Sequence, residues 1–321
     1  MCYGFDGERA LTQSLAARQT GRRSLLRGAL AGVVGAGALA AAGVANAPAA
    51  HATARRTGRP IVPPGLISIQ LYTVRAALGG EPGFDDTLRA IARAGYPKVE
   101  QAGYYGRTAA QLRSFYDGLG ISCTSSHDGI SGSREALDTK IENALTLGQR
   151  YMVVPWLNST SLADWQRWAE RMNEEAAVAR SAGLRYGYHN HAHEFTIDLG
   201  GGTTPWDVLT SELDPRLVHL ELDLYWAVTG GINSGHGDDP EGFTIDVIRR
   251  APQRVLQYHV KDRHEQGGDM ADLGTGMIDF PRIFRAHSVQ EYIVENDTPD
   301  VTPIQTAEVG YRYLRTLDLR C

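Results

Sequence analysis

Cysteine is scarce in this chain of 321 residues, which has three, at positions 2, 123 and 321. Cysteines so few and so widely spaced cannot form the disulfide framework that stabilises small secreted domains. They also exclude a closed metal site built from clustered thiolates. A hydrophobic core must therefore stabilise the fold, and hydrophobic residues make up 42 % of the chain.

Runs of like charge are also absent, and the formal net charge is −5. A chain without a basic excess has no general attraction to nucleic acids or to anionic membrane surfaces. No Gly-x-Gly-x-x-Gly motif follows the first predicted strand, so a dinucleotide-binding fold has no support. The sequence therefore predicts neither a nucleic-acid partner nor a nicotinamide cofactor.

The N-terminal segment lacks charged residues from position 28 to position 50. Arg22 and Arg23 precede this stretch, and two small-x-small cleavage patterns end it, at 45–47 and 50–52. This order is typical of an export signal, and the paired arginines followed by leucines resemble the twin-arginine type. A retained membrane anchor is the alternative, since a span needs ~20 apolar residues. The Ala and Gly richness favours cleavage.

We accordingly predict a signal peptide over 1–52, a flexible lead-in over 53–64 and a catalytic domain over 65–321. The mature protein is expected to be exported, to the periplasm or beyond, with no stable membrane span after cleavage. Residues 53–321 come close to the ~250 residues of an eight-stranded α/β barrel.

Short β-rich segments alternate with longer amphipathic segments after Leu66. In 84–94, for example, Leu88, Ile91 and Ala92 form the i, i+3, i+4 stripe of a helix. Eight such alternations predict a parallel α/β sheet closed into a (β/α)8, or TIM, barrel. A doubly wound open sheet is the alternative. The predicted strands are 66–72, 97–101, 121–126, 150–155, 184–191, 217–224, 254–261 and 290–295. Predicted helices include 84–94, 108–119, 134–147 and 161–182, followed by Gly95, Gly120, Gly148 and Gly183 as C-terminal caps.

Polar residues stand at the ends of the last three predicted strands. Because side chains two apart share a face of a strand, outward leucines place Asp223 inside the barrel, and outward Tyr258 places His259 and Lys261 inside. Glu295 ends the last strand in the same way. Chemistry in such barrels takes place at the C-terminal strand ends. Asp, His and Glu side by side are costly to bury without a cation, so we predict a metal site there.

The fifth strand adds His189 and His191 on one face, with Glu194 in the following loop. Oxygen ligands combined with imidazoles suit Mn, Co, Mg, Fe or Zn. If this segment were helical, His189 and His193 would lie one turn apart, as in zinc proteases. The preceding Leu-Arg-Tyr-Gly-Tyr segment is not typical of a helix.

Other predicted strand ends carry aromatic and hydrogen-bonding side chains. Such side chains around a metal suit a polyol that has apolar ring faces. Ordinary packing is the alternative explanation for the tryptophans. These candidate substrate-binding residues are Tyr72, Glu100, His127, Trp156 and Trp226.

The chain from about Gly65 onward resembles the sugar phosphate isomerase/epimerase family, the xylose-isomerase-like TIM barrels. Each motif is weak alone, but together they occur in order along almost the whole mature chain. The motifs are Ile69-Gln-Leu-Tyr-Thr-Val-Arg75, Val99-Glu-Gln-Ala-Gly-Tyr-Tyr-Gly106, Ser126-His127, Tyr188-His-Asn-His-Ala-His-Glu-Phe195, Glu221-Leu-Asp-Leu-Tyr-Trp226, His259-Val-Lys-Asp262, Gly274-Thr-Gly-Met-Ile-Asp-Phe280 and Tyr292-Ile-Val-Glu-Asn-Asp297.

The resemblance implies one divalent metal held by Glu, Asp, His and Glu at four strand ends. Asp223, His259 and Glu295 match the last three positions. The first position falls on His189, so either His189 replaces the carboxylate or Glu194 reaches the metal. We favour Glu194, because a third carboxylate is closer to the charge balance that the resemblance implies.

The resemblance also implies proton abstraction beside a carbonyl of a sugar, giving isomerisation or epimerisation. Catalytic candidates are His189, His191 and Lys261, since imidazoles and tuned amines act as bases or acids near neutrality. A lyase or dehydratase acting on keto-sugars or 3-keto-glycosides shares this step and is the first alternative.

Two further alternatives belong to other functional classes. A non-catalytic sugar-binding barrel would keep the fold without the reaction. An abasic-site endonuclease shares the fold but needs a basic face, which the net charge of −5 disfavours. Free sugar phosphates are mainly cytoplasmic, so the predicted export argues against a phosphorylated substrate. Gly274-Thr275-Gly276 is a weak candidate for a phosphate-binding loop.

Overall fold

Eight parallel strands form a closed barrel in the computed structural model, which describes residues 61–317. Neighbouring strands pair in the order β1-β10-β7-β6-β5-β4-β3-β2, so the last strand closes onto the first. The strands are β1 (Ile67–Gln70), β2 (Lys98–Gln101), β3 (Ser122–His127), β4 (Tyr151–Val154), β5 (Arg185–His189), β6 (Val218–Asp223), β7 (Val255–Val260) and β10 (Glu291–Val294).

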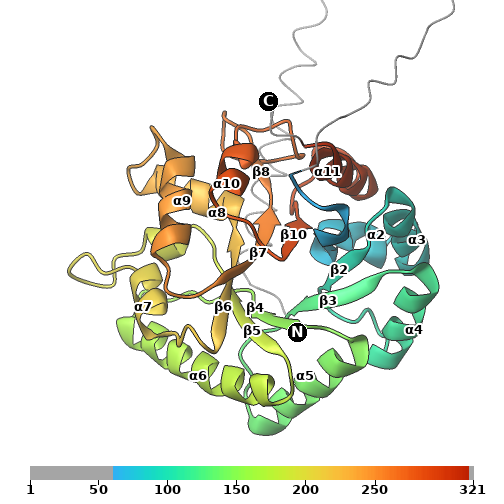
Figure 1. Ribbon diagram of the computed structural model, residues 1–321, viewed down its shortest axis with the longest axis horizontal. Coiled ribbons are helices and arrows are strands. Elements are labelled where there is room, and N and C mark those ends of the chain that lie inside the picture. Colours follow the sequence, from blue (N-terminus) through green and yellow to red (C-terminus); the bar gives the residue numbers. More distant parts are fainter. Residues whose placement is uncertain (1–60, 318–321) are drawn as a thin grey trace, which may run out of the picture. The chain divides into compact units, whose positions relative to one another are not determined.

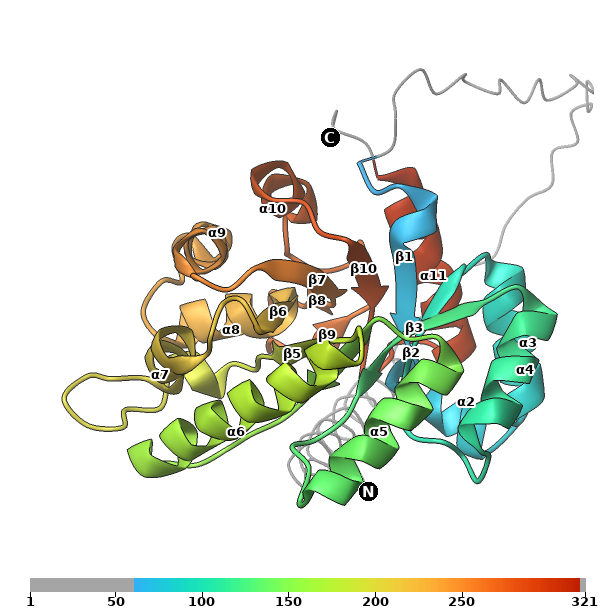
Figure 2. The ribbon, with the colours of Figure 1, turned by 60° about the horizontal axis from the view of Figure 1, so that its bottom comes forward.

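Helices surround the strands (Figure 1). The turned view shows α5 and α6 along the outside of the sheet, with α3 and α4 beside β2 and β3 (Figure 2). The α-helices are α2 (Arg75–Gly79), α3 (Phe84–Ala94), α4 (Ala109–Leu119), α5 (Arg134–Leu147), α6 (Leu162–Ser181), α7 (Pro205–Glu212), α8 (Leu224–Asn233), α9 (Pro240–Arg250), α10 (Phe280–Ala286) and α11 (Pro303–Thr316). Short 3-10 turns are η1 (Pro64–Leu66), η2 (Leu71–Val74) and η3 (His193–Phe195).

The predicted barrel is confirmed, and each predicted strand lies within two residues of an observed one at both ends. Helices also end where glycine was expected to stop them. Gly120, for example, caps α4 with a left-handed backbone (φ 69°) that most side chains disfavour. The periodic spacing of apolar residues therefore predicted the elements correctly.

Most hydrophobic strand residues face the helices, whereas the barrel interior holds polar residues and a separate small cluster of Tyr151, Val153 and Leu256. Leu222 and Tyr258 are buried in the main hydrophobic core. Toward the N-terminal strand ends, Lys98 Nζ lies 3.0 Å from Glu291 Oε1, and Thr124 donates a hydrogen bond to Glu291 Oε2. This ion pair lies toward the N-terminal end of the barrel interior, opposite the C-terminal strand ends where chemistry takes place in such barrels.

A two-stranded hairpin of β8 (Asp262–Arg263) and β9 (Met270–Ala271) follows β7. No helix within residues 61–317 is both long enough and apolar enough to cross a membrane. The predicted signal peptide (1–52) and most of the predicted lead-in lie outside the described residues.

Candidate active site

Four side chains from adjacent strands meet at the C-terminal mouth of the barrel. His189, Asp223, His259 and Glu295 each offer a ligand atom, and these atoms lie within 4.8 Å of one another. The pairing of β6 with β7 places Asp223 beside His259, and Glu295 directly follows β10. All four residues are buried. We call this set the mouth group.

The Lys261 ammonium lies among three carboxylates at the same mouth. Its Nζ atom is 3.1 Å from Asp223 Oδ2, 2.9 Å from Glu295 Oε2 and 3.2 Å from Asp297 Oδ2. Burial alone would lower the pKa of Lys261, but these carboxylates outweigh burial and raise it well above its usual value. One ammonium faces three carboxylates here, and a divalent cation would add to the positive charge that balances them.

The residues of the mouth group fit such a cation. Asp223 Oδ2 is buried, 3.1 Å from Lys261 Nζ and 3.8 Å from His189 Nε2, whereas Oδ1 accepts a hydrogen bond from the Trp226 amide. Burial raises the pKa of Asp223 to about 6. Two imidazoles and two carboxylates form a donor set that suits Mn, Fe, Co or Zn. The mouth group would therefore hold the metal that the sequence predicts.

Aromatic side chains line the space beside the mouth group. The His191 ring lies 5.1 Å from the His189 ring, 4.4 Å from the Trp156 ring and 5.3 Å from the Trp226 ring, measured between centroids. His191 Nδ1 and Trp226 Nε1 are buried without a hydrogen-bond partner among the described residues. Burial, followed by the neighbouring His189, lowers the pKa of His191 well below its usual value, so this imidazole is neutral. These groups remain available to a substrate.

Tyr72 and Arg75 form another part of the strand-end surface. Tyr72 lies in η2 after β1, and the Arg75 guanidinium stacks over its ring at 3.9 Å. Arg75 also donates hydrogen bonds to the backbone oxygens of Tyr72 and Asp297. This arginine therefore bridges the first and last strand ends.

A deeper group of histidines and glutamates lies next to the mouth group. Glu100 and His127, predicted to bind substrate, lie here together with Glu221, which the sequence analysis missed. Burial, and then the Glu221 charge, raises the pKa of Glu100 to about 7. Burial would also raise the pKa of Glu221, but His259 and the other imidazoles outweigh it and lower the pKa well below its usual value. Strand alternation could have revealed Glu221, because it lies two residues before inward-facing Asp223.

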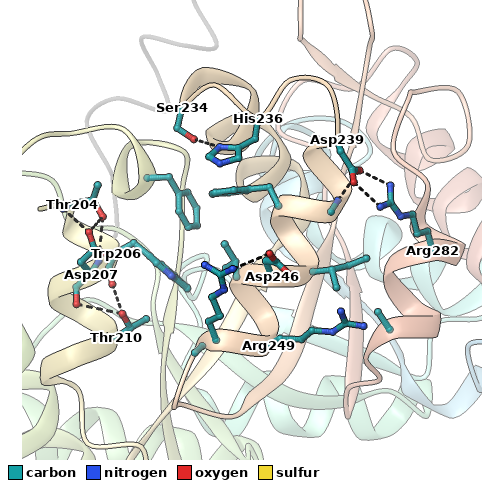
Figure 3. Close-up of a pocket in the computed structure, with 18 of the residues that line it drawn as sticks. Thr204, Trp206, Asp207, Thr210, Ser234, His236, Asp239, Asp246, Arg249 and Arg282 are labelled. Atoms are coloured by element: carbon teal, nitrogen blue, oxygen red, sulfur yellow. Dashed lines mark hydrogen bonds and ion pairs between the residues drawn. The ribbon is translucent and has the colours of Figure 1, made fainter. Parts of the chain in front are cut away.

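A cavity on the outside of the barrel is remote from this chemistry. It encloses about 1160 Å³ between α7, α9 and α10, and Figure 3 shows Trp206, Asp246 and Arg249 among its lining side chains. None of the mouth residues lines it. The candidate active site is therefore the barrel mouth.

Comparison with known proteins identifies the family. A profile of the xylose isomerase-like TIM barrel family matches residues 88–315. The chain belongs to this family. Two relatives, both named inosose dehydratase, come from Glaesserella parasuis serovar 5 (strain SH0165) and Histophilus somni (strain 129Pt). They are 25 % and 23 % identical to this chain over 287 residues, covering 74 % of it and 91 % of each relative.

Solved structures of xylose isomerase-like barrels share the fold. A sugar phosphate isomerase/epimerase from Parabacteroides distasonis ATCC 8503 has a TM-score of 0.64 and 24 % identity, covering 79 % of this chain and 95 % of its own. An L-ribulose 3-epimerase has a TM-score of 0.55 and 15 % identity, covering 78 % and 93 %. The names of these relatives are those of enzymes.

This xylose isomerase-like barrel places His189, and not Glu194, in the mouth group. Glu194 is buried in η3, where one oxygen accepts a hydrogen bond from the Tyr188 hydroxyl (2.6 Å) and the other from the His191 amide (2.8 Å). The choice of Glu194 as fourth ligand therefore does not match the geometry. Its carboxylate instead orders the turn that carries His191. His189, predicted both as a catalytic candidate and as the alternative fourth ligand, lies in the mouth group.

The glycine-rich loop considered for phosphate is already occupied by a side chain of the protein. The amides of Gly274 and Gly276 both donate hydrogen bonds of 3.0 Å to Asp262 Oδ2. A Cβ atom at Gly276 would lie 2.2 Å from Asp262 Oδ1, which explains why glycine is needed there. These amides order the loop after β7, so the loop provides no phosphate cradle.

Proposed function

We propose that this protein is a metal-dependent enzyme that removes a proton beside the carbonyl of a neutral keto-sugar and then eliminates water or another β-oxygen substituent. The observation that carries this proposal is the His191 imidazole, whose Nδ1 atom is buried without a hydrogen-bond partner among the described residues and whose ring adjoins the mouth group. A divalent cation held by His189, Asp223, His259 and Glu295 would polarise the carbonyl and favour the enolate.

His191 is the proposed base. Its pKa is lowered by burial, so the ring is unprotonated at neutral pH and can accept the proton from carbon. The electrons of the broken C–H bond form the C=C bond of an enolate, and the carbonyl π electrons move to its oxygen. When the carbonyl re-forms, that C=C pair shifts to make a double bond to the next carbon, and the C–O bond at that carbon breaks. The departing oxygen takes the proton from protonated His191 and leaves as water or an alcohol, so no oxidant or reductant is needed. Lys261 supplies positive charge near the developing negative charge on oxygen.

A neutral substrate is proposed because the cations beside the mouth are already engaged. Lys261 faces three carboxylates, and Arg75 donates to two backbone oxygens. The loop at Gly274 and Gly276 is likewise occupied by Asp262. A phosphate would therefore meet a negatively charged mouth without an available cation from these groups. The aromatic rings of Trp156 and Trp226 suit the apolar face of a sugar ring.

Elimination is preferred over epimerisation because of the residue at the end of β5. Epimerisation is commonly performed by two metal-bound glutamates, one of which is replaced here by His189. The name of both inosose dehydratase relatives is consistent with loss of water. Isomerisation or epimerisation remains the second candidate, because a protonated His191 could return its proton to a neighbouring carbon.

The test is turnover in deuterated water by Mn²⁺-loaded protein. An inosose, a 3-keto-glucoside and a simple ketose are incubated separately, and the products are analysed by mass and NMR. Elimination is expected from the inosose or the 3-keto-glucoside, with a product lighter than its substrate by the departing group. An isomer of the substrate that carries deuterium beside the carbonyl supports isomerisation. No turnover of any keto-sugar would contradict both candidates.

We also propose that the mature enzyme works outside the cytoplasm, on the basis of Arg22-Arg23 and the uncharged stretch that follows. Intact-mass measurement of protein from its native host is expected to show an N-terminus between residues 48 and 53. A full-length chain in the cytoplasm would contradict this proposal.

A further inference from the structure

Two histidines of the mouth group present their second ring nitrogen to a deeper set of side chains. His259 Nδ1 lies 2.7 Å from Glu295 at the mouth, whereas its Nε2 lies 3.0 Å from Glu221 and 2.7 Å from Glu100. His189 Nε2 lies 3.8 Å from Asp223, whereas its Nδ1 lies 3.3 Å from Glu221. Each imidazole therefore connects the mouth with a deeper group.

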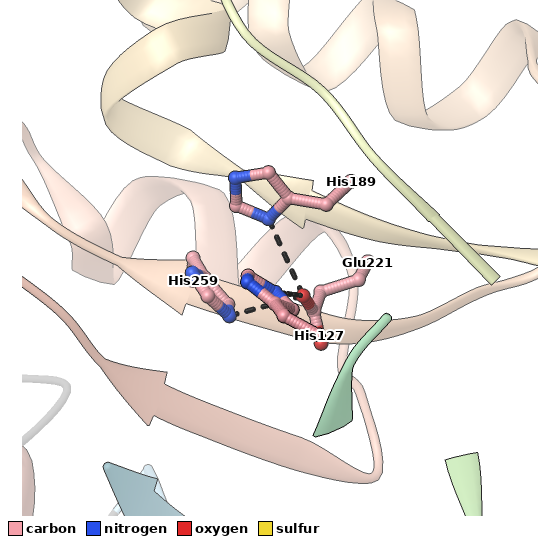
Figure 4. Close-up of side chains that lie close together, drawn as sticks. All are labelled: His127, His189, Glu221 and His259. Atoms are coloured by element: carbon pink, nitrogen blue, oxygen red, sulfur yellow. Dashed lines mark hydrogen bonds and ion pairs between the residues drawn. The ribbon is translucent and has the colours of Figure 1, made fainter. Parts of the chain in front are cut away.

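The deeper group has the composition of a transition-metal site. His127, His189, Glu221 and His259 offer ligand atoms within 4.8 Å of one another, and we call them the inner tetrad. Figure 4 shows the three imidazoles directed at one oxygen of Glu221. Glu221 Oε1 is 2.8 Å from His127 Nε2, 3.0 Å from His259 Nε2 and 3.3 Å from His189 Nδ1. Ligands of a tetrahedral zinc ion are about 3.3 Å apart, so small outward shifts would admit one.

The charge of this region also calls for a cation. Glu100 and Glu221 are fully buried, and within residues 61–317 neither forms an ion pair with lysine or arginine. Glu221 Oε2 is buried without a hydrogen-bond partner in the same part of the chain. Buried carboxylates are costly unless a positive charge balances them.

We propose that the inner tetrad is a second metal position, selective for Zn²⁺ or a similar borderline ion. Three nitrogens and one oxygen form a softer donor set than the two nitrogens and two oxygens of the mouth group, which suits Mn²⁺. The two positions exclude each other, because a neutral imidazole has one lone pair and His189 and His259 belong to both groups. With Zn²⁺ in the inner tetrad, the mouth carboxylates accept the opposite N–H of each ring.

This second position makes the enzyme sensitive to the identity of the metal. Zn²⁺ in the inner tetrad removes His189 and His259 from the mouth and leaves Asp223 and Glu295 paired with Lys261. The Zn²⁺-loaded form is therefore expected to be inactive and the Mn²⁺-loaded form active. This consequence rests on the proposed function, whereas the metal position itself does not.

The test uses the metal-free full chain, loaded with Zn²⁺ alone or Mn²⁺ alone. His127→Asn removes a ligand that belongs to the inner tetrad and not to the mouth group. The substitution is expected to weaken Zn²⁺ binding more than about 100-fold, while Mn²⁺ affinity changes only a few-fold. Loss of a residue that only orients a ligand typically lowers metal affinity 10–100-fold, so loss of a ligand itself should lower it further. Retained Mn²⁺ binding and an unchanged melting temperature exclude misfolding.

Anomalous diffraction at the zinc and manganese absorption edges then locates each ion. A zinc peak beside Glu221 and a manganese peak beside Asp223 and Glu295 are expected. A zinc peak at the mouth, or unchanged Zn²⁺ affinity in His127→Asn, would overturn the proposal and leave Glu221 and His127 as groups that orient the imidazoles. Such a failure would leave Mn²⁺-dependent turnover unaffected, so it is distinguishable from failure of the proposed function.

Discussion

Asp223→Asn is expected to lower the affinity of the protein for Mn²⁺ by more than about 100-fold and to abolish turnover. The substitution keeps the size of the side chain but removes the negative charge of the carboxylate whose Oδ2 atom faces Lys261 and His189 at the mouth. This carboxylate is one of the three around the Lys261 ammonium, so without its charge the mouth attracts a cation less strongly. Even an outer partner of a metal site is typically worth 10–100-fold in affinity, so a ligand should exceed that range.

Glu295→Gln should behave in the same way, and Glu194→Gln is the matched control. Glu194 is also buried on the β5 side of the barrel, but its oxygens bond to Tyr188 and to the His191 amide. Its variant should retain Mn²⁺ binding within about 10-fold. Titration of each metal-free variant, monitored by electron paramagnetic resonance, measures these affinities. Full Mn²⁺ binding by Asp223→Asn and Glu295→Gln, with loss in Glu194→Gln, would instead identify Glu194 as the ligand.

His191→Ala is expected to reduce kcat by about 10²–10⁴-fold, the usual contribution of a general base. The effect should fall on kcat more than on KM, because the imidazole acts mainly in the proton-transfer step. Metal occupancy should be unchanged, since His191 belongs to neither group of candidate ligands. Exchange of the substrate C–H proton with deuterated water should decrease in parallel with kcat.

His193→Ala provides the comparison for this prediction. His193 lies in the same segment and also contacts the Trp156 ring, but its Nε2 already bonds to the backbone oxygen of Leu157 at 2.7 Å. Its removal should lower kcat by less than about 10-fold, through small shifts of the loop. Equal losses in the two variants would show that the loop, and not the His191 imidazole, matters for catalysis. Steady-state kinetics with the keto-sugar that is turned over measures both.

The strand ends show how far sequence alone could predict the site. The alternation of side chains along β6, β7 and the last strand correctly predicted that Asp223, His259 and Glu295 share the barrel interior. This alternation is a local property of an extended backbone, so it can be read from the sequence. The same alternation would have placed Glu221 inside the barrel as well, because it lies two residues before Asp223. The preference for Glu194 did not match the geometry, because charge balance was considered without Lys261, whose ammonium lies among the mouth carboxylates.

The sequence by itself determined the barrel, its elements and the inward position of the polar residues, since these depend on local periodicity and on glycine caps. The tertiary structure alone decided which of these residues meet. His259 and Glu100, 159 positions apart, become neighbours only because the last strand pairs with the first. The structure also decided that His189 joins the mouth group, because hydrogen bonds from Tyr188 and the His191 amide hold Glu194 away. Such contacts depend on side-chain rotation and barrel closure, which no local pattern in the sequence encodes.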